Sequence, residues 1–282
     1  MTSKAIILIN TGTPLSPDVK AVRAFLKRFL SDKAVIDLPD WLWKPILYTH
    51  VLPLRTPHSS RRYAAVWMKE GSPQVVFMNR IAQKLATRVA SDIIVRSAFL
   101  YSDPDVQTTV KTLAGQGVKE AVFLPLYPQY ARQTVGSARI AIENATKDFD
   151  LKTSIIEPYG KDDAYVELVA RHIASYRQNE HLVMSFHGLP VKAVNVANPY
   201  DADCYDFAKK LAQKLDLKSD DYSVAFQSKF GHGAWLSPYL ADTLTNCATQ
   251  KRSVDVAALS FACDCLETLE EIGLAHQKAF MA

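Results

Sequence analysis

Cysteine is scarce in this chain of 282 residues, which has only four: Cys204, Cys247, Cys263 and Cys265. Their uneven spacing argues against a disulfide framework and fits a reducing cytoplasm. Cys263 and Cys265 have no matching pair elsewhere, so neither a tetrahedral zinc site nor a four-ligand iron–sulfur cluster is expected. We interpret the cysteines as small buried residues.

Long hydrophobic runs are lacking too, although 48% of the residues are hydrophobic. No run reaches the roughly 20 apolar residues that a membrane-spanning helix needs. The apolar run 5–9 is too short for a signal peptide, and Asn-Thr-Gly follows it in place of a cleavage site. The sequence therefore predicts a cytoplasmic protein whose first apolar run is a buried strand.

Neither a strong excess of charge nor a glycine-rich phosphate loop is present. The 33 lysines and arginines exceed the 29 acidic residues by only four, so a nucleic-acid partner is not expected. No G-x-G-x-x-G follows the first apolar run, and no Walker motif occurs. These absences argue against a dinucleotide site and a nucleotide-triphosphate site.

Short apolar runs do alternate with longer helical patterns along the whole chain. The first set predicts strands at 5–10, 93–101, 120–128 and 151–159, and helices at 17–31, 104–116, 135–147 and 162–178. The second set predicts strands at 181–188, 221–228 and 253–262, and helices at 200–215, 237–249 and 264–280. Such alternation predicts parallel sheets with helices on both faces. We expect an α/β fold of two doubly wound domains, 1–165 and 166–282, with an active cleft between them.

Ligands of open parallel sheets bind at the carboxyl ends of the strands, so the residues there are the candidates. His187 ends the apolar run 182–186 and is followed by Gly188. A lone histidine at such a position is commonly structural. Here the strand end faces the ligand side, and Gly188 lets another group approach the backbone closely. An imidazole in that place suits a general base or a metal ligand near neutral pH.

An acidic row begins at the end of the last predicted strand. Asp264, Glu267 and Glu271 are spaced three and four residues apart, which places them on one face of a predicted helix. A solvated acidic face is one interpretation of this row. The other is a site for a hard divalent cation, which carboxylate oxygens attract.

Two aromatic segments complete the candidates. Residues 226–244 contain Trp235 between a strand and a helix, and this loop either packs in the core or holds a flat apolar ligand. Residues 38–55 are rich in tryptophan and leucine, and their prolines argue against one regular helix. This second segment is either core or an apolar lip for a hydrophobic substrate or a membrane surface.

Taken together, these stretches resemble the ferrochelatases, which insert ferrous iron into a porphyrin. The resemblance covers nearly the whole chain, and its motifs occur in the family's order: LINTGTP, FLKRFLSD, LPLR, YAAVWMKEGSP, VFLPLYPQYARQTVGS, SFHGLP, FQSKFGHGAWLSPYLADTL and FACDCLETLEEI. Several long motifs in one order are far more specific than any single motif.

The resemblance implies a lyase of haem biosynthesis that makes protohaem from protoporphyrin IX and ferrous iron. It implies His187 and Glu267 as catalytic residues, and Asp264 and Glu271 beside them on the side of the metal. The residues that it implies along the porphyrin are Asn10, Thr13, Tyr127, Tyr130, Ser137, Gln227, Ser228, Lys229 and Trp235. Iron is then a substrate, no tightly bound cofactor is expected, and contact with the inner membrane at its surface stays open.

Three departures from the family's pattern keep other functions in view. Cys265 replaces a histidine found in some members, Leu100 replaces an arginine, and the chain ends at Ala282, where members continue with a strand, a P-x-L-N segment and a helix. The first alternative is a catalytically weak paralogue that binds porphyrin or haem as a carrier or a regulator. A cobalt or sirohydrochlorin chelatase is the second, and the glutamate-centred helix argues against it.

Overall fold

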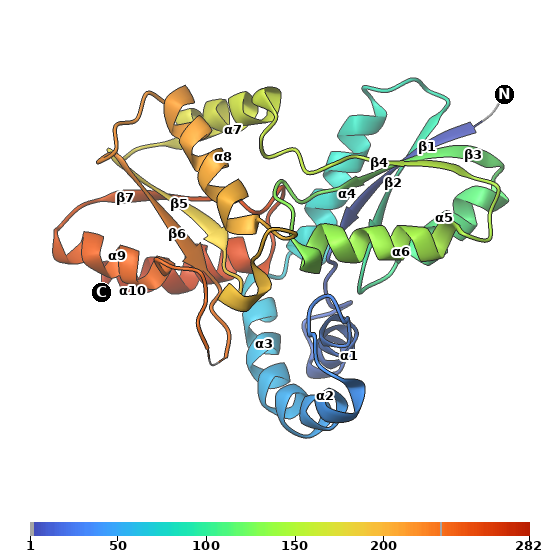
Figure 1. Ribbon diagram of the computed structural model, residues 1–282, viewed down its shortest axis with the longest axis horizontal. Coiled ribbons are helices and arrows are strands. Elements are labelled where there is room, and N and C mark those ends of the chain that lie inside the picture. The colour runs from blue at the N-terminus through green and yellow to red at the C-terminus, as the bar shows by residue number, and fades with distance from the viewer. Residues whose placement is uncertain (1–2, 232) are drawn as a thin grey trace. The chain divides into compact units, whose positions relative to one another are not determined.

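The computed structural model describes residues 3–231 and 233–282, so position 232 of the aromatic loop lies outside the described residues. By their contacts the residues form two compact units. One unit comprises the chain up to Leu126 together with 132–157 and 263–266, and the other comprises 127–131, 158–262 and 267–282. Each unit has its own sheet with helices around it, which confirms the predicted α/β fold of two parallel sheets (Figure 1).

The first unit has a sheet in the order β2-β1-β3-β4, and all of its strand pairs are parallel. Its strands are β1 (Ser3–Asn10), β2 (Ile93–Phe99), β3 (Val118–Pro125) and β4 (Lys152–Ile155). Its α-helices are α1 (Val19–Leu30), α2 (Asp40–Ile46), α3 (Leu52–Val66), α4 (Pro73–Ala86), α5 (Val106–Gly115) and α6 (Ser137–Thr146). The unit also has two π-helical segments: η1 (Leu47–Val51) connects α2 with α3, and η2 (Arg132–Gly136) directly precedes α6.

Strand β1 is apolar on both faces because helices cover both. Ile7 and Ile9 pack with residues of α5 and α6 in one buried cluster. On the opposite face the side chain of Asn10 contacts Met78 of α4. Successive side chains of β1 point to opposite faces of the sheet, and helices cover each face. The strand is therefore apolar at consecutive positions.

The proline-rich segment is helical from Asp40 onward, but it is not one regular helix. Helices α2 and α3 follow one another through the π turn η1, and Pro45 and Pro57 lie inside the two α-helices. The prediction from the prolines is therefore confirmed. Leu47 and Leu52 are fully buried, so part of the segment belongs to the core, whereas Trp41 and Leu54 are 78% and 76% exposed.

The second unit has a parallel sheet in the order β6-β5-β7. Its strands are β5 (His181–His187), β6 (Tyr222–Gln227) and β7 (Val254–Ala258). Its helices are α7 (Asp163–Tyr176), the 3₁₀ turn η3 (Val191–Ala193), α8 (Tyr200–Lys214), α9 (Leu240–Thr249), the π-helix η4 (Glu267–His276) and α10 (Gln277–Met281).

Strand β5 is the buried centre of this sheet. Met184 and Phe186 pack against residues of α7 and α8, and each such buried side chain contributes about 1.5–3 kcal/mol. Val183 lies on the other face and packs against residues of α9, η4 and α10. Because side chains alternate along a strand, Ser185 and His187 lie on the Val183 face, which η4 helps to cover.

Two predicted elements differ from the structure at the carboxyl end of the chain. The strand predicted at 253–262 ends at Ala258, because the pairing of β7 with β5 stops there. The helix predicted at 264–280 begins at Glu267 and is wound as a π-helix for ten residues. Asp264 therefore precedes the helix, and its predicted place on one helical face with Glu267 and Glu271 is wrong. Across residues 3–231 and 233–282, no helix has the length and apolar character needed to cross a bilayer.

Candidate functional site

His187 is the last residue of β5, at the carboxyl end of the central strand of its sheet. Its ring is half-buried, and Nδ1 lies 2.7 Å from the carbonyl oxygen of Gly188. A carbonyl oxygen only accepts hydrogen bonds, so Nδ1 carries the proton. In the neutral ring, Nε2 then has a free lone pair that can take a proton or bind a metal ion.

Gly188 is required by close packing at this strand end. A Cβ atom at this position would lie 2.7 Å from the carbonyl oxygen of Gln227 and 3.5 Å from Cε3 of Trp235. The first distance is shorter than any ordinary contact, and the same carbonyl accepts the Gly188 N–H at 2.8 Å. The glycine thus lets β6 and the Trp235 ring approach the backbone beside His187, as the sequence predicted.

Gln227 links the sheet to the first turn of η4. Its Oε1 accepts a 2.8 Å hydrogen bond from the hydroxyl of the buried Ser185. Its Nε2 lies 3.4 Å from the carbonyl oxygen of Glu267 and 3.5 Å from the hydroxyl of Ser228. Gln227 is itself buried, so it fixes the place where the helix that carries Glu267 begins.

Ser228 holds both carboxylate oxygens of Glu271. The Ser228 N–H donates to Oε1 at 2.7 Å, and the hydroxyl donates to Oε2 at 2.8 Å. His276 lies five residues further along the π-helix, and its Nε2 is 3.9 Å from Oε1. Ser228 has a φ of 64°, which is uncommon outside glycine and orients its N–H toward the carboxylate. The structure thus joins two predicted site residues, Ser228 and Glu271, by two hydrogen bonds.

Lys229 and Trp235 belong to the loop between β6 and α9. The ammonium group of Lys229 lies over the ring of Tyr239, 4.3 Å from the ring centroid, in a cation–π contact. Trp235 is half-buried and pairs with Pro190 in an isolated antiparallel bridge. This loop is therefore tied to the segment that follows His187.

Tyr127 and Tyr130 also belong to the second unit, although they directly follow a strand of the first. Tyr127 is buried and Tyr130 is half-buried. Between them, Gln129 donates to the carbonyl oxygen of Leu259 at 3.3 Å, just beyond β7. That contact fastens the short segment 127–131 to the second sheet.

Asn10 lies buried in the first unit, at the carboxyl end of β1. Its Nδ2 approaches Sδ of Met78 at 3.9 Å and Sγ of Cys263 at 3.7 Å, and its Oδ1 accepts from Nε2 of Gln74 at 3.1 Å. The remaining acceptor of Gln74, Oε1, is buried without a hydrogen-bond partner in the described structure. Burial, with a smaller effect of the nearby Asp264 charge, raises the pKa of the Cys263 thiol to about 12.

The other predicted residues of the first unit are less closely associated. Thr13 is buried and shares a 2.8 Å hydrogen bond with the hydroxyl of Ser72. Ser137 is buried at the start of α6, and its hydroxyl has no hydrogen-bond partner among the described residues. Asp264 is exposed and belongs to the first unit, whereas Glu267 belongs to the second. Within the described residues, no three His, Cys, Asp or Glu side chains form a group that could hold a metal ion.

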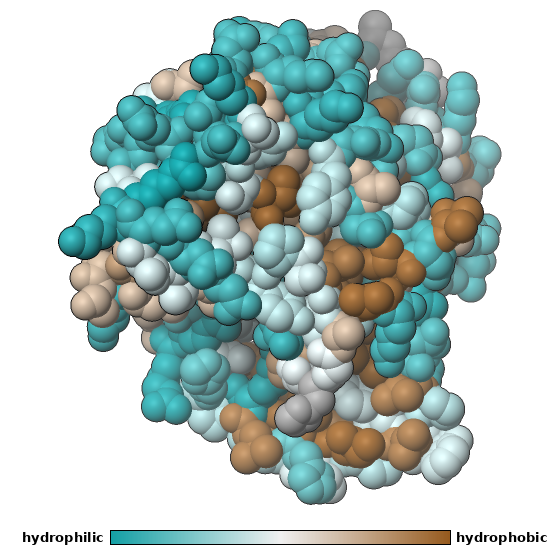
Figure 2. All heavy atoms as spheres, turned by 60° about the vertical axis from the view of Figure 1, so that its left-hand side comes forward, coloured by the Kyte–Doolittle hydropathy of each residue, from teal (hydrophilic) through white to brown (hydrophobic). Residues whose placement is uncertain are grey.

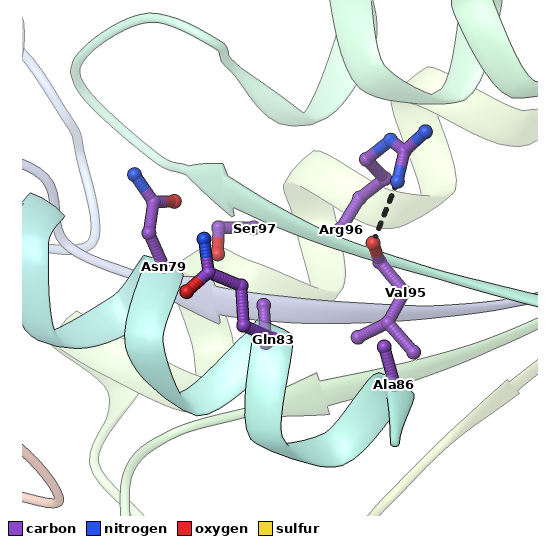
Figure 3. Close-up of a pocket in the computed structure, with 7 residues that line it drawn as sticks. Asn79, Gln83, Ala86, Val95, Arg96 and Ser97 are labelled. Atoms are coloured by element: carbon purple, nitrogen blue, oxygen red, sulfur yellow. Dashed lines mark hydrogen bonds between the residues drawn. The ribbon is translucent and has the colours of Figure 1, made fainter.

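All four cysteines are free, and Cys204, Cys247 and Cys265 are buried. The prediction that they are not paired in disulfides is confirmed. None of the predicted site residues lines the surface pocket of about 310 Å³ between α4 and β2 (Figure 3). Polar side chains such as Asn79 and Gln83 line it, and the Arg96 guanidinium folds back to donate to the Val95 carbonyl at 2.9 Å. We assign no chemistry to this pocket.

Two residues that contact His187 were not predicted from the sequence. Tyr200 donates to the carbonyl oxygen of His187 at 2.8 Å, and the His187 N–H donates to the hydroxyl of Ser260 at 3.1 Å. Ser260 follows an apolar run, which is the signal that selected the other candidates. No sequence signal points to Tyr200, because only the folded chain brings the start of α8 to the end of β5.

Comparison with solved structures concerns the fold. The fold is similar to that of SirB from Bacillus subtilis with Fe³⁺, at a TM-score of 0.54 and 13% identity, over 99% of this chain and 84% of that one. It is likewise similar to the sirohydrochlorin chelatase SirB from Bacillus subtilis subspecies spizizenii in complex with cobalt, at a TM-score of 0.53 and 12% identity, over 99% and 82% of the two chains. At this identity the likeness shows the fold alone.

Sequence comparison then gives the family. The ferrochelatase family model matches residues 3–282. The chain is 38% identical to the ferrochelatase of Neisseria gonorrhoeae, over 98% of this chain and 84% of that protein. It is 39% identical to ferrochelatase 1 of Shewanella oneidensis, over 98% and 86% of the two chains.

The chain therefore belongs to the ferrochelatase family, and the resemblance seen in the sequence is confirmed. Membership makes it a metal-chelating lyase of haem biosynthesis, with porphyrin and iron as its substrates.

Proposed function

We propose that this chain inserts ferrous iron into protoporphyrin IX with His187 as the base. The observation that carries the role of His187 is the 2.7 Å contact of its Nδ1 with the Gly188 carbonyl. In the neutral ring this contact places the proton on Nδ1 and leaves the Nε2 lone pair free, at the carboxyl end of a central strand, where ligands of such sheets bind. An imidazole is suited to accept a proton near neutral pH.

The reaction removes two protons. Fe²⁺ replaces the two pyrrole N–H protons of the porphyrin, so protohaem and two protons are the products. In the proposal, Nε2 of His187 takes one proton. The carboxylate of Glu267 accepts the other proton, or it ligates the iron ion while the ion loses its bound water. Iron passes through as a substrate, and we propose no resident cofactor.

The other residues are given supporting roles. Asp264 and Glu271 supply negative charge on the side of the metal, and the two Ser228 hydrogen bonds keep the Glu271 carboxylate in place. The porphyrin contacts that we propose are the residues implied by the family's motifs: Asn10, Thr13, Tyr127, Tyr130, Ser137, Gln227, Ser228, Lys229 and Trp235.

The test is anaerobic insertion of Fe²⁺ into protoporphyrin, with Zn²⁺ as a second metal, followed by the loss of free-base fluorescence. Wild type is compared with His187→Ala and with His172→Ala, a matched control in which an exposed histidine of α7 is removed. We expect turnover to collapse only in His187→Ala. Equal turnover in all three proteins would overturn the role of His187, and tight porphyrin binding without turnover in wild type would indicate a carrier.

We further propose that residues 15–66, which include α1, α2 and α3, lie against an anionic membrane surface at the inner face of the cytoplasmic membrane. Trp41, Leu54 and Leu15 are 78%, 76% and 74% exposed. Hydrophobic side chains gather over the part of the molecule where α1–α3 lie (Figure 2). Residues 15–66 contain nine lysines and arginines against four aspartates, so this segment has a larger positive excess than the whole chain. Exposed apolar groups beside basic ones are typical of interfacial segments.

Sedimentation with vesicles tests the membrane contact. We expect binding to vesicles that contain phosphatidylserine, weaker binding to neutral vesicles, and loss of binding in Trp41→Ala. Tyr176→Ala removes a side chain that is 72% exposed on α7, and it serves as the control. Equal binding of the two variants, or no binding of wild type, would contradict this part of the proposal.

A further inference from the structure

The backbone of His187 lies beyond the end of its neighbouring strand. The pairing of β5 with β7 ends at Ser185 and Ala258, and the last backbone bond runs from the Leu259 N–H to the Ser185 carbonyl at 2.8 Å. In a parallel pair, residues two apart direct their N–H and C=O groups toward the same neighbour. The N–H and C=O of His187 therefore point to the β7 side of β5, past the last paired residue of that strand.

Two side-chain hydroxyls take the place of the missing strand. The His187 N–H donates to the hydroxyl oxygen of Ser260 at 3.1 Å, and the hydroxyl of Tyr200 donates to the His187 carbonyl at 2.8 Å. The two hydroxyl oxygens are 2.8 Å apart. The only hydroxyl proton of Tyr200 is donated to the His187 carbonyl. The Ser260 hydroxyl must therefore donate to the Tyr200 oxygen.

The three groups thus form a closed ring of hydrogen bonds. His187 N–H donates to Ser260, Ser260 donates to Tyr200, and Tyr200 donates to the His187 carbonyl. Each proton is used once, and hydrogen bonds arranged in such a chain strengthen one another.

The ring is built on rigid parts of the second unit. Tyr200 is the first residue of α8 and is only 5% exposed. It belongs to the buried cluster that α7 and α8 form on one face of the sheet. Burial raises the pKa of Tyr200 well above its ordinary value, so its phenol remains a donor throughout the working pH range.

We propose that Tyr200 and Ser260 are positioning residues for His187. By holding both peptide groups of this residue, they place its ring so that Nδ1–H reaches the Gly188 carbonyl and Nε2 is left free. The inference rests on the proposed function, because the free Nε2 is the atom that takes the pyrrole proton. Both hydroxyls bond to the backbone of His187, so we assign each a role that acts through this residue.

The experiment compares Tyr200→Phe and Ser260→Ala with wild type. Each variant removes one hydroxyl and opens the ring of hydrogen bonds. Tyr205→Phe is the matched control, because it removes a hydroxyl from the same helix at a tyrosine that is 45% exposed. Ser260→Thr keeps the hydroxyl and serves as the rescue.

Four quantities are measured: kcat, KM for protoporphyrin, thermal stability, and the tautomer of His187 by ¹⁵N NMR. We expect kcat to fall about 10-fold in Tyr200→Phe and in Ser260→Ala, which is part of the roughly 10²–10⁴-fold that a correctly positioned general base contributes. KM should stay unchanged. The ¹⁵N spectrum should show the proton shared between Nδ1 and Nε2 in these variants and confined to Nδ1 in wild type, Tyr205→Phe and Ser260→Thr.

The outcomes separate this inference from the proposed function. If His187→Ala is inactive but both ring variants keep the wild-type kcat and tautomer, positioning by Tyr200 and Ser260 is wrong while the role of His187 stands. If His187→Ala is active, the proposed role fails, and the tautomer still reports on positioning. Lower thermal stability with an unchanged tautomer would assign the hydroxyls a purely structural role. Should Tyr200→Phe not fold, Ser260→Ala and Ser260→Thr provide the same comparison.

Discussion

Replacing Gly188 by alanine tests how tightly the strand end beside His187 is packed. The added Cβ would lie 2.7 Å from the carbonyl oxygen of Gln227, and that oxygen belongs to the backbone of β6, so it cannot rotate away as a side chain would. Relief requires the two strands to separate, which lengthens the 2.8 Å hydrogen bond from the Gly188 N–H to that oxygen. Forcing one extra carbon into a packed site costs about 1–3 kcal/mol.

The control is the same substitution at Gly273, in η4 of the same unit. A Cβ there would meet only the Thr268 carbonyl oxygen, at 3.4 Å. Because alanine is favoured over glycine in a helix by roughly 0.5–1 kcal/mol, we expect Gly273→Ala to be as stable as wild type or slightly more stable. Adding one methyl group is thus expected to lower the free energy of unfolding at Gly188 and to leave it unchanged or raise it at Gly273.

Urea unfolding followed by circular dichroism measures both variants, and hydrogen exchange of peptides from β5 and β6 locates the effect. We expect the unfolding midpoint of Gly188→Ala to fall and exchange to rise at 182–188 and 222–227. Metal insertion should slow as well, because Gly188 supplies the carbonyl that holds Nδ1 of His187. A Gly188→Ala protein with the midpoint and exchange of wild type would refute the packing argument.

Three further predictions concern the carboxylates. Glu267→Gln should bind protoporphyrin as wild type does, measured by fluorescence quenching, and lose metal insertion; near-normal turnover would remove its assigned role. Ser228→Ala deletes the 2.8 Å hydrogen bond to Glu271 and should cost about 1.5–3 kcal/mol in urea unfolding, the range for bonds to charged groups, whereas an unchanged midpoint would show the contact to be weak. Burial raises the pKa of Asp255, but the N–H groups of Asn179 and Gln178 lower it by more, so it lies below its ordinary value. A lowered folded pKa stabilises the protein above the unfolded value near 3.9 and ceases to do so as the pH falls through the folded value. Asp255→Asn should therefore lower the urea midpoint at pH 7, and its difference from wild type should shrink as the pH falls below the unfolded value near 3.9.

The alternation of strands and helices was predictable because it is a local property. A run such as 181–187 is apolar at every position, and a strand buried on both faces needs that pattern. His187, Gln227 and Ser228 were found by the same reasoning, since a polar residue directly after a buried strand must lie at the ligand end of its sheet.

Helix winding was not predictable, because it depends on contacts made after folding. Spacings of three and four placed Asp264, Glu267 and Glu271 on one face, as an α-helix would. In the structure Gln227 holds the first turn at Glu267, and the wider π-helix brings Glu271 beside His276 at a spacing of five. The acidic residues that we propose for the metal side could be chosen from the sequence, but their arrangement could not.

The sequence by itself determined the α/β class, the family and the position of His187 at a strand end, because buried strands, turn residues and long motifs are formed by consecutive residues. Only the tertiary structure decided which residues hold that histidine. Tyr200 is thirteen positions after His187 and Ser260 is seventy-three after it. They meet because β7 ends two residues early and leaves a backbone N–H and a backbone carbonyl that must find partners.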